Sequence, residues 1–169
     1  PLMHSKFIIE VAKELHKENI HVALDTSGVG LGDYEEILPY IDLILLDVKH
    51  VTKEGYKDIT GLELQEVEKF IEVANKLNKQ IWIRQVIVPG VMDNEQYLDN
   101  LVEYLKHIKN IKRIDFLPYH NLGKDKYDKL NIDYPYKDKP NMDKSKCDEL
   151  YKIFIEKYRT YMMMFWKRT

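Results

Sequence analysis

A nearly continuous run of branched aliphatic residues at positions 41–48 constrains the fold of this chain most strongly. Such a run is typical of a central strand in a parallel sheet, which is covered on both faces. Shorter apolar runs predict further strands at residues 20–24, 80–88 and 112–117, followed by Gly, Pro or small polar residues. Helical patterns separate these strands. The alternation predicts an α/β fold with a parallel sheet built from right-handed crossover units.

The helical patterns are identified by apolar residues at spacings of three and four. The first helix begins at Ser5, a candidate N-cap, and its apolar stripe is expected to lie against the sheet. Further helices are predicted at residues 33–38 and 64–77, after a cap at Asp93 or Asn94, and at residues 145–158. The polar stretch 119–143 is predicted to be a long loop, either functional or disordered. We expect a single domain over residues 1–169.

Charge and composition exclude several classes of protein. The 26 Lys and Arg residues against 28 Asp and Glu residues give a net charge of -2, so no strong field recruits nucleic acid or an anionic membrane. No apolar run approaches the roughly 20 residues needed to span a bilayer. The single cysteine, Cys147, excludes an internal disulfide framework and cannot hold a metal cluster by itself. We therefore expect a soluble protein of the reducing cytoplasm.

The two ends of the sequence are unusual. It opens at Pro1 without an initiator methionine, and we interpret it as a piece of a longer chain. Residues 161–169 contain three methionines beside Phe165 and Trp166. Three interpretations stay open for this segment: an apolar anchor on the body of the protein, a partner site, or a consequence of where the sequence ends.

Polar side chains mark the carboxyl ends of the predicted strands, where parallel α/β folds bind their ligands. They are Asp25 and Thr26 after the first strand, Asp47 and Lys49 at the second, Arg84 within the third and His120 after the fourth. Side chains alternate along a strand, so Asp47 and Lys49 point the same way and Val48 points the opposite way. A carboxylate, an ammonium group and an imidazole at one mouth suit a zwitterionic ligand with hydroxyl groups.

Each of these residues also has an ordinary structural interpretation. Asp47 and Lys49 could form a strand-end ion pair, worth about 0 to 1 kcal/mol if exposed. Residues 25–28 could be only a capped turn, and His120 could only contact backbone. Arg84 is harder to explain in this way, because a charge on an otherwise apolar strand needs a partner or access to the mouth of the fold. Such residues at four successive strands together favour a site.

Four segments, in the same order, resemble those of the pyruvate formate-lyase activating enzyme family. They are Leu24-Asp25-Thr26-Ser27-Gly28, Leu46-Asp47-Val48-Lys49, Ile81-Trp82-Ile83-Arg84 with Val88-Pro89-Gly90, and Leu117-Pro118-Tyr119-His120-Asn121-Leu122-Gly123-Lys124. The resemblance covers about residues 1–158, and the last segment is the most specific. It implies a radical S-adenosylmethionine (SAM) fold, which is a partial TIM-like barrel of six strand-helix units. This chain would keep the last four units.

The resemblance also implies cofactors and partners. In the family, a three-cysteine motif binds a [4Fe-4S] cluster whose open iron holds the amino and carboxylate groups of SAM. Electron transfer, from a donor such as flavodoxin or ferredoxin, then cleaves SAM to methionine and a 5′-deoxyadenosyl radical. That radical removes hydrogen from a backbone glycine of the partner, which would be pyruvate formate-lyase.

Residue roles are implied by the matching motifs. The implied SAM-binding residues are Thr26, Asp47, Val48, Lys49 and His120. The implied monovalent-cation site consists of Asp25, Thr26 and Asp47. Within these sets, Lys49 would pair with the SAM carboxylate and His120 would touch the adenosyl group. Arg84 matches a catalytic arginine that faces SAM or the incoming glycine loop.

The sequence departs from the family because both the three-cysteine motif and the Gly-Gly-Glu before Pro1 are absent. We expect these 169 residues alone to bind no iron and to cleave no SAM, since Cys147 on a late helix cannot substitute. An open sheet edge at residues 20–24 is expected to favour self-association. Two alternatives remain, an activating enzyme for a different glycyl-radical enzyme and a non-catalytic α/β binding domain. A complete barrel enzyme for sugar phosphates or amino acids is disfavoured, because no phosphate-binding glycine loop appears.

Overall fold

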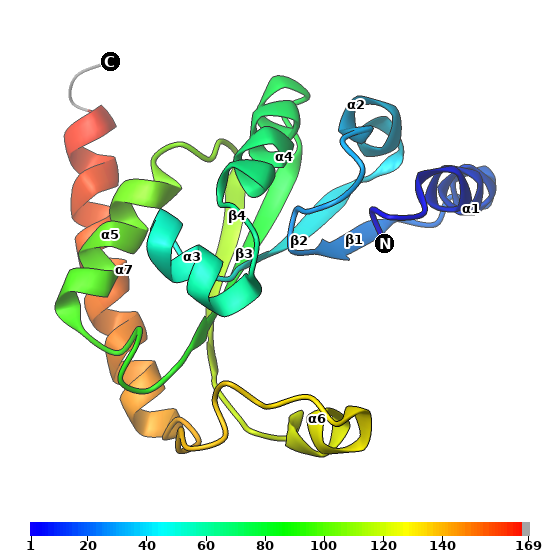
Figure 1. The fold of residues 1–169 in the computed structure, drawn as a ribbon. Helices are drawn as coiled ribbons and strands as arrows, with labels where there is room; N and C mark the ends of the chain where they lie inside the picture. The colour runs from blue at the N-terminus through cyan, green and yellow to red at the C-terminus, as the bar shows by residue number, and fades with distance from the viewer. Residues whose placement is uncertain (167–169) are drawn as a thin grey trace. The chain divides into compact units, whose positions relative to one another are not determined.

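A computed structural model describes residues 1–166 of the chain, with side chains through residue 163. Helices and strands alternate along it, as Figure 1 shows. The elements are α1 Ser5–Lys17, β1 Ala23–Thr26, α2 Tyr34–Ile37, η1 Leu38–Tyr40, β2 Leu43–Val48, α3 Lys53–Thr60, α4 Gln65–Lys76, β3 Gln80–Ile87, α5 Glu95–Leu105, β4 Ile111–Pro118, α6 Lys124–Leu130 and α7 Lys144–Trp166. Internal contacts divide the chain into two compact units, residues 1–85 with 103–115 and residues 86–102 with 116–169. The single-domain organisation stays a prediction.

The strands form one sheet in the order β1-β2-β3-β4. β1 pairs with β2 in parallel, with Leu24 opposite Ile44, and β2 pairs with β3 in parallel, with Ile44 opposite Ile81. The predicted α/β class with four parallel strands is therefore confirmed. β1 lies at one end of this order and starts later than predicted, so the sheet edge expected at residues 20–24 is formed by Ala23–Thr26.

In the first unit, one face of the sheet is covered by helices. The side chains of Ile44, Leu46, Ile81 and Ile83 on this face are fully buried. α4 packs here, because a methyl group placed on Gly28 would meet Val67 and Phe70 of α4 together with Leu46 of β2. The ring of Phe70 also packs edge-on against Tyr34 of α2, with 5.2 Å between centroids.

The other face of this part of the sheet is only half-buried, and we call it the open face. Leu43, Leu45 and Asp47 of β2 and Trp82 and Arg84 of β3 project from it. The predicted coverage of β2 on both faces is therefore wrong for the described residues, since burial alternates along the strand. Side chains on the open face are therefore partly accessible to a ligand.

The first helix differs from its prediction in two ways. Ser5 is not its cap, because the N-cap residue is His4 and no side chain caps the helix. Its apolar stripe is only partly covered: Ala12 is buried, whereas Phe7 is 67% exposed and Val11 is 39% exposed.

Asp42, just before β2, fixes the loops at the amino-terminal end of the sheet. Its carboxylate accepts a hydrogen bond from the backbone N–H of Val22 at 2.7 Å and lies 3.0 Å from Nε2 of His16. The pKa of Asp42 lies below its ordinary value. The hydrogen bond from Val22 is the largest cause, and the contact with His16 is the next. A carboxylate with a lowered folded-state pKa stabilises the fold above its unfolded-state pKa, and this contribution is lost as the pH falls through the folded-state pKa.

We therefore expect the free energy of unfolding to fall between about pH 5 and pH 3, and Asp42→Asn to reduce that fall. The effect should be at most about 1 kcal/mol, since the Asp42 side chain is 39% exposed. Urea denaturation across this pH range measures it. Asp128→Asn is the matched control, because Asp128 is an exposed carboxylate on the short helix α6. Identical pH profiles for Asp42→Asn and the unchanged chain would contradict the prediction.

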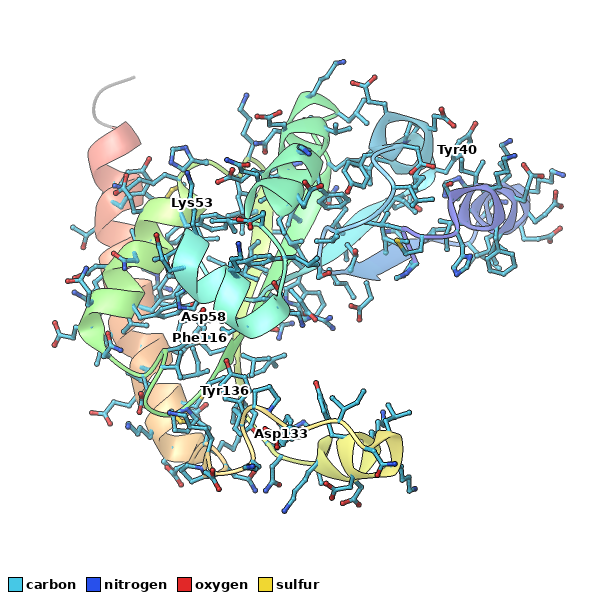
Figure 2. All side chains as sticks on the ribbon, in the orientation of Figure 1. Tyr40, Lys53, Asp58, Phe116, Asp133 and Tyr136 are labelled. Carbon is cyan, nitrogen blue, oxygen red and sulfur yellow. The ribbon has the colours of Figure 1, made fainter. Side chains whose placement is uncertain are left out.

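The second unit is built around α7 and the end of β4. The ring of Phe116, labelled in Figure 2, packs against Tyr151 at 5.5 Å and Phe154 at 5.0 Å between centroids. The segment expected to be a loop contains α6 and a tyrosine cluster, in which the hydroxyls of Tyr119 and Tyr134 lie 2.6 Å apart. Residues 119–143 are thus more ordered than predicted.

α7 continues well beyond the predicted end at residue 158 and reaches Trp166. Met162 and Met163 are therefore helical and exposed. The role proposed for the methionine-rich end falls partly on residues 167–169, which lie outside the described part of the chain, as do the side chains from residue 164 onward. Within the described residues, no helix combines the length and apolar character required to cross a bilayer.

Candidate functional site

Three of the predicted site residues meet on the open face of the first unit. Asp25 lies on β1, Asp47 on β2 and Arg84 on β3, and Asp47 stands directly opposite Arg84 in the parallel register. All three side chains point to the same side, because their strand neighbours Leu24, Val48 and Ile83 are buried on the other. The alternation inferred from the sequence therefore holds for each of these strands.

Arg84 bridges the two carboxylates. Its Nε donates to Oδ1 of Asp47 at 2.8 Å, and its Nη2 lies 2.7 Å from the same oxygen. Nη2 also donates to Oδ1 of Asp25 at 2.5 Å. The charge of Arg84 on β3 therefore has a partner on β1 and another on β2, as expected for a charged residue on an otherwise apolar strand.

Lys49 completes the group. Its Nζ donates to Oδ2 of Asp47 at 3.0 Å, so both oxygens of that carboxylate are occupied. Two acids and two bases give this four-residue network no net charge. The prediction that Asp47 and Lys49 share one side is confirmed, and the ion pair that was the simpler interpretation of these two residues is also formed.

The network is partly screened from water. The side chains of Arg84 and Asp47 are 22% and 24% exposed, whereas Asp25 is 58% exposed. Burial by itself would lower the pKa of Arg84, but the hydrogen bond to Asp25 and the charge of Asp47 outweigh it and raise that pKa above its ordinary value. Arg84 therefore stays a fixed positive charge between two carboxylates.

Thr26 and Val48 point away from this network. Both are buried on the covered face. The Thr26 hydroxyl accepts a hydrogen bond from the backbone N–H of Gly28 at 3.0 Å, so it closes the turn after β1 in the way that an ordinary capped turn does. Gly28 has a φ of +84°, which favours glycine at that position. Any contact of Thr26 or Val48 with a ligand on the open face would use main-chain atoms.

His120 belongs to the second unit, where it is exposed after the end of β4. Its neighbours are fixed within that unit. The N–H of Tyr119 donates to the carbonyl of Ile87 at 3.2 Å, and the N–H of Asn121 donates to Oδ1 of Asn141 at 2.9 Å. A place for His120 in the same site as Lys49 stays a prediction.

A second polar group on the open face was missed in the sequence. Nε1 of Trp82 donates to Oδ2 of Asp115 at 2.9 Å, and Nε of Arg113 donates to the other oxygen of that carboxylate at 2.9 Å. The Arg113 guanidinium lies over the Trp82 ring, 4.3 Å from its centroid. The signal was the alternation of Arg113 and Asp115 in β4, which places both on the face opposite the buried Ile114.

The residues of this chain do not fit an iron-sulfur cluster. Such clusters are held mainly by several cysteine thiolates, and the sequence contains one cysteine. Cys147 is buried on α7, and burial raises the pKa of its thiol, which disfavours the thiolate. Among the described residues, no group of three or more His, Cys, Asp or Glu side chains is placed to hold a metal ion.

Comparison with solved structures defines the class of fold. A domain of a pyruvate-formate lyase-activating enzyme from Bacteroides vulgatus superposes with a TM-score of 0.72 at 19% identity, covering 92% of this chain and 88% of that one. A radical SAM methyltransferase from Sphaerobacter thermophilus gives a TM-score of 0.60 at 15% identity, covering 84% of this chain and 41% of that one. The fold is therefore that of radical SAM enzyme domains, consistent with a partial TIM-like barrel.

Comparison with curated sequences then identifies the family, although no family model matches. The chain is 42% identical over 155 residues to the pyruvate formate-lyase-activating enzyme of Clostridium pasteurianum, covering 92% of this chain and 65% of the relative. It is 31% identical to that of Staphylococcus epidermidis, covering 90% of this chain and 63% of the relative. The chain belongs to the pyruvate formate-lyase-activating enzyme family. It spans just under two thirds of the length of these relatives.

Proposed function

We propose that this chain is part of an enzyme that cleaves SAM reductively and generates a glycyl radical on pyruvate formate-lyase. The observation that carries the proposal is the network of Asp25, Asp47, Lys49 and Arg84 on the open face of a radical SAM fold. Membership of the activating enzyme family supports the choice of reaction. The chain covers 65% and 63% of the length of two of these relatives.

In the proposed site, Lys49 binds the SAM carboxylate, and its pairing with Asp47 holds the ammonium group in place for it. The backbone of Val48 lies between these two residues and offers main-chain groups to the ligand. Arg84 faces SAM or the incoming glycine loop and keeps the two carboxylates together. Arg84 would bind or orient its ligand and would not transfer a proton, because a salt-bridged guanidinium does not exchange protons near neutral pH.

Further parts of the proposal concern ions and partners. Asp25 and Asp47, with main-chain atoms of Thr26, would hold a monovalent cation beside the SAM carboxylate. His120 would contact the adenosyl group. The electron would come from a one-electron donor such as flavodoxin or ferredoxin. The protein would lie in the cytoplasm, and this chain would self-associate through the β1 edge.

Reductive cleavage needs an electron delivered to the sulfonium of SAM, and these 169 residues contain no ligand set for the cluster that supplies it. After anaerobic reconstitution with iron and sulfide, the chain alone is expected to retain no stoichiometric iron and to form no 5′-deoxyadenosine. Iron analysis and chromatography of the products measure both. Stoichiometric iron together with 5′-deoxyadenosine from this chain would refute that expectation.

The proposal itself is tested on the reading frame that contains Pro1. We expect a Cys-x-x-x-Cys-x-x-Cys stretch in the upstream part of the frame, followed by a Gly-Gly-Glu that is joined to Pro1. The protein from the extended frame should form 5′-deoxyadenosine and should produce a glycyl radical signal by electron paramagnetic resonance when pyruvate formate-lyase is added. A frame without that cysteine stretch would overturn the proposal. A radical formed on a different glycyl-radical enzyme, but not on pyruvate formate-lyase, would change the partner.

A further inference from the structure

A short segment at the start of β4 carries an unusual density of positive charge. Residues 106–113 include four cationic side chains and His107 but no acid, the cations being Lys106, Lys109, Lys112 and Arg113. Two of these cations pair with acids just outside the segment, Lys106 with Glu103 and Arg113 with Asp115. The whole chain has a slight excess of acid, so this segment is an exception to its composition. It lies at the amino-terminal end of a parallel strand, away from the strand ends that form the Lys49 network.

Asparagine side chains bond the backbone of this segment to the end of α4 and to the loop after it. Nδ2 of Asn75 donates to the carbonyl of His107 at 2.8 Å, and Oδ1 of Asn75 accepts from the N–H of Lys109 at 2.7 Å. Nδ2 of Asn110 donates to the carbonyl of Asn78 at 3.0 Å. Two asparagine side chains thus fix the loop before β4, so the basic side chains are presented from an ordered backbone.

Arg113 is held in one orientation. Its guanidinium lies over the Trp82 ring, and its Nε donates to Asp115, whose other oxygen accepts from Trp82. Its side chain nevertheless remains 60% exposed. The described residues provide no hydrogen-bond partner for its two terminal nitrogens. An arginine whose stem and Nε are already ordered loses less entropy when those two nitrogens bind a carboxylate.

We propose that the segment 106–113 is a docking surface for an acidic segment of a partner protein, with Arg113 as its anchor. Trp82 and Arg113 belong to the residue types that are enriched in the hot spots of protein interfaces. The exposed side chains of Lys109 and Lys112 add the charge that steers an acidic partner toward it. The inference is independent of the SAM chemistry, because none of these residues belongs to the Lys49 network.

Charged residues on a terminal strand of a sheet also have a simpler use, which is to prevent pairing with another sheet edge. β4 is such a strand in the order of this sheet. Protection of an edge requires charge alone and gains nothing from the stacking of Arg113 on Trp82. The two roles therefore differ in how they respond to Arg113→Lys.

The test uses the 169-residue chain and fluorescein-labelled poly-L-glutamate, with binding measured by fluorescence anisotropy. We expect saturable binding at low salt that weakens as ionic strength rises, and a loss of about tenfold in affinity for Lys109→Gln/Lys112→Gln/Arg113→Gln. Arg113→Lys alone should lose part of that affinity, because it keeps the positive charge but not the two terminal guanidinium nitrogens. Lys6→Gln/Lys53→Gln/Lys152→Gln is the matched control with the same change in net charge.

Each contrary outcome would overturn the proposal. They are absence of binding at low salt, an equal loss in the control, and tighter binding to a double-stranded DNA of the same length than to poly-L-glutamate. Aggregation of the triple variant with unchanged affinity in its soluble fraction would leave only the protective role. Circular dichroism of every variant confirms that the fold is retained before affinities are compared.

Discussion

Arg84→Gln is expected to lower glycyl-radical formation by about 100-fold in the extended enzyme, the loss that follows when reacting groups are misplaced by about 1 Å. Arg84 is the one residue that contacts both Asp25 and Asp47 in the network. Without it, two carboxylates face each other across β1 and β2 with only Lys49 left to neutralise them. We expect them to separate, which moves Lys49 because its Nζ is bonded to Asp47.

The same substitution should reduce the free energy of unfolding by only about 1 kcal/mol, since Asp25 is 58% exposed and its ion pair is screened by water. A large loss of rate with a small loss of stability distinguishes a site residue from a structural one. The rate of radical formation and a urea denaturation curve provide the two measurements.

Two variants control this experiment. Arg84→Lys keeps one positive charge but cannot place two nitrogens between the carboxylates, so it should retain an intermediate rate. Arg159→Gln removes an exposed arginine from α7 and should change neither quantity. A full rate in Arg84→Gln would show that the network has no part in the reaction.

The residues of this network were largely predictable from the sequence. Parallel strands place their carboxyl ends together, and side-chain alternation alone assigns Asp47 and Lys49 to one face. The contact between Arg84 and Asp25 was not predictable in the same way. It reaches across β2, so it depends on the register of three strands, which periodicity does not determine.

The group of Trp82, Arg113 and Asp115 could not be predicted from the sequence for the same reason. Each residue looks unremarkable on its own strand, and only the pairing of β3 with β4 brings them to one carboxylate. Sequence patterns describe single strands, whereas such a group is a property of neighbours in a sheet.

Helices α3 and α6 were missed for a different reason. Each is a short helix, and α3 contains Gly55, one of the weakest helix formers. α3 is stabilised by the Thr52 side chain, which accepts from the N–H of Gly55, and by the burial of Tyr56. Tertiary packing decides such helices, because propensity alone is too weak over so few residues.

Gly55→Ala is expected to destabilise the chain by about 1–3 kcal/mol, although alanine favours a helix over glycine. A methyl group at position 55 would overlap three atoms of the His50 imidazole. His50 cannot move away freely, because it is largely buried and its Nδ1 accepts from the N–H of Thr52 at 3.2 Å. Overlap with a confined ring therefore outweighs the gain in helix propensity. His50 directly follows Lys49, so its displacement should also disturb the end of β2.

Two further variants isolate the cause of this loss. Gly123→Ala is the control, because no atom lies within 4 Å of the added methyl group and its φ of -74° suits alanine. It should change the free energy of unfolding by no more than about 1 kcal/mol. His50→Ala/Gly55→Ala removes the ring along with the overlap, and the two substitutions should couple by about 1 kcal/mol or more in a double-mutant cycle measured by urea denaturation. Additive losses would mean that the two residues act separately, and the close approach of Gly55 to the imidazole would then have no energetic consequence.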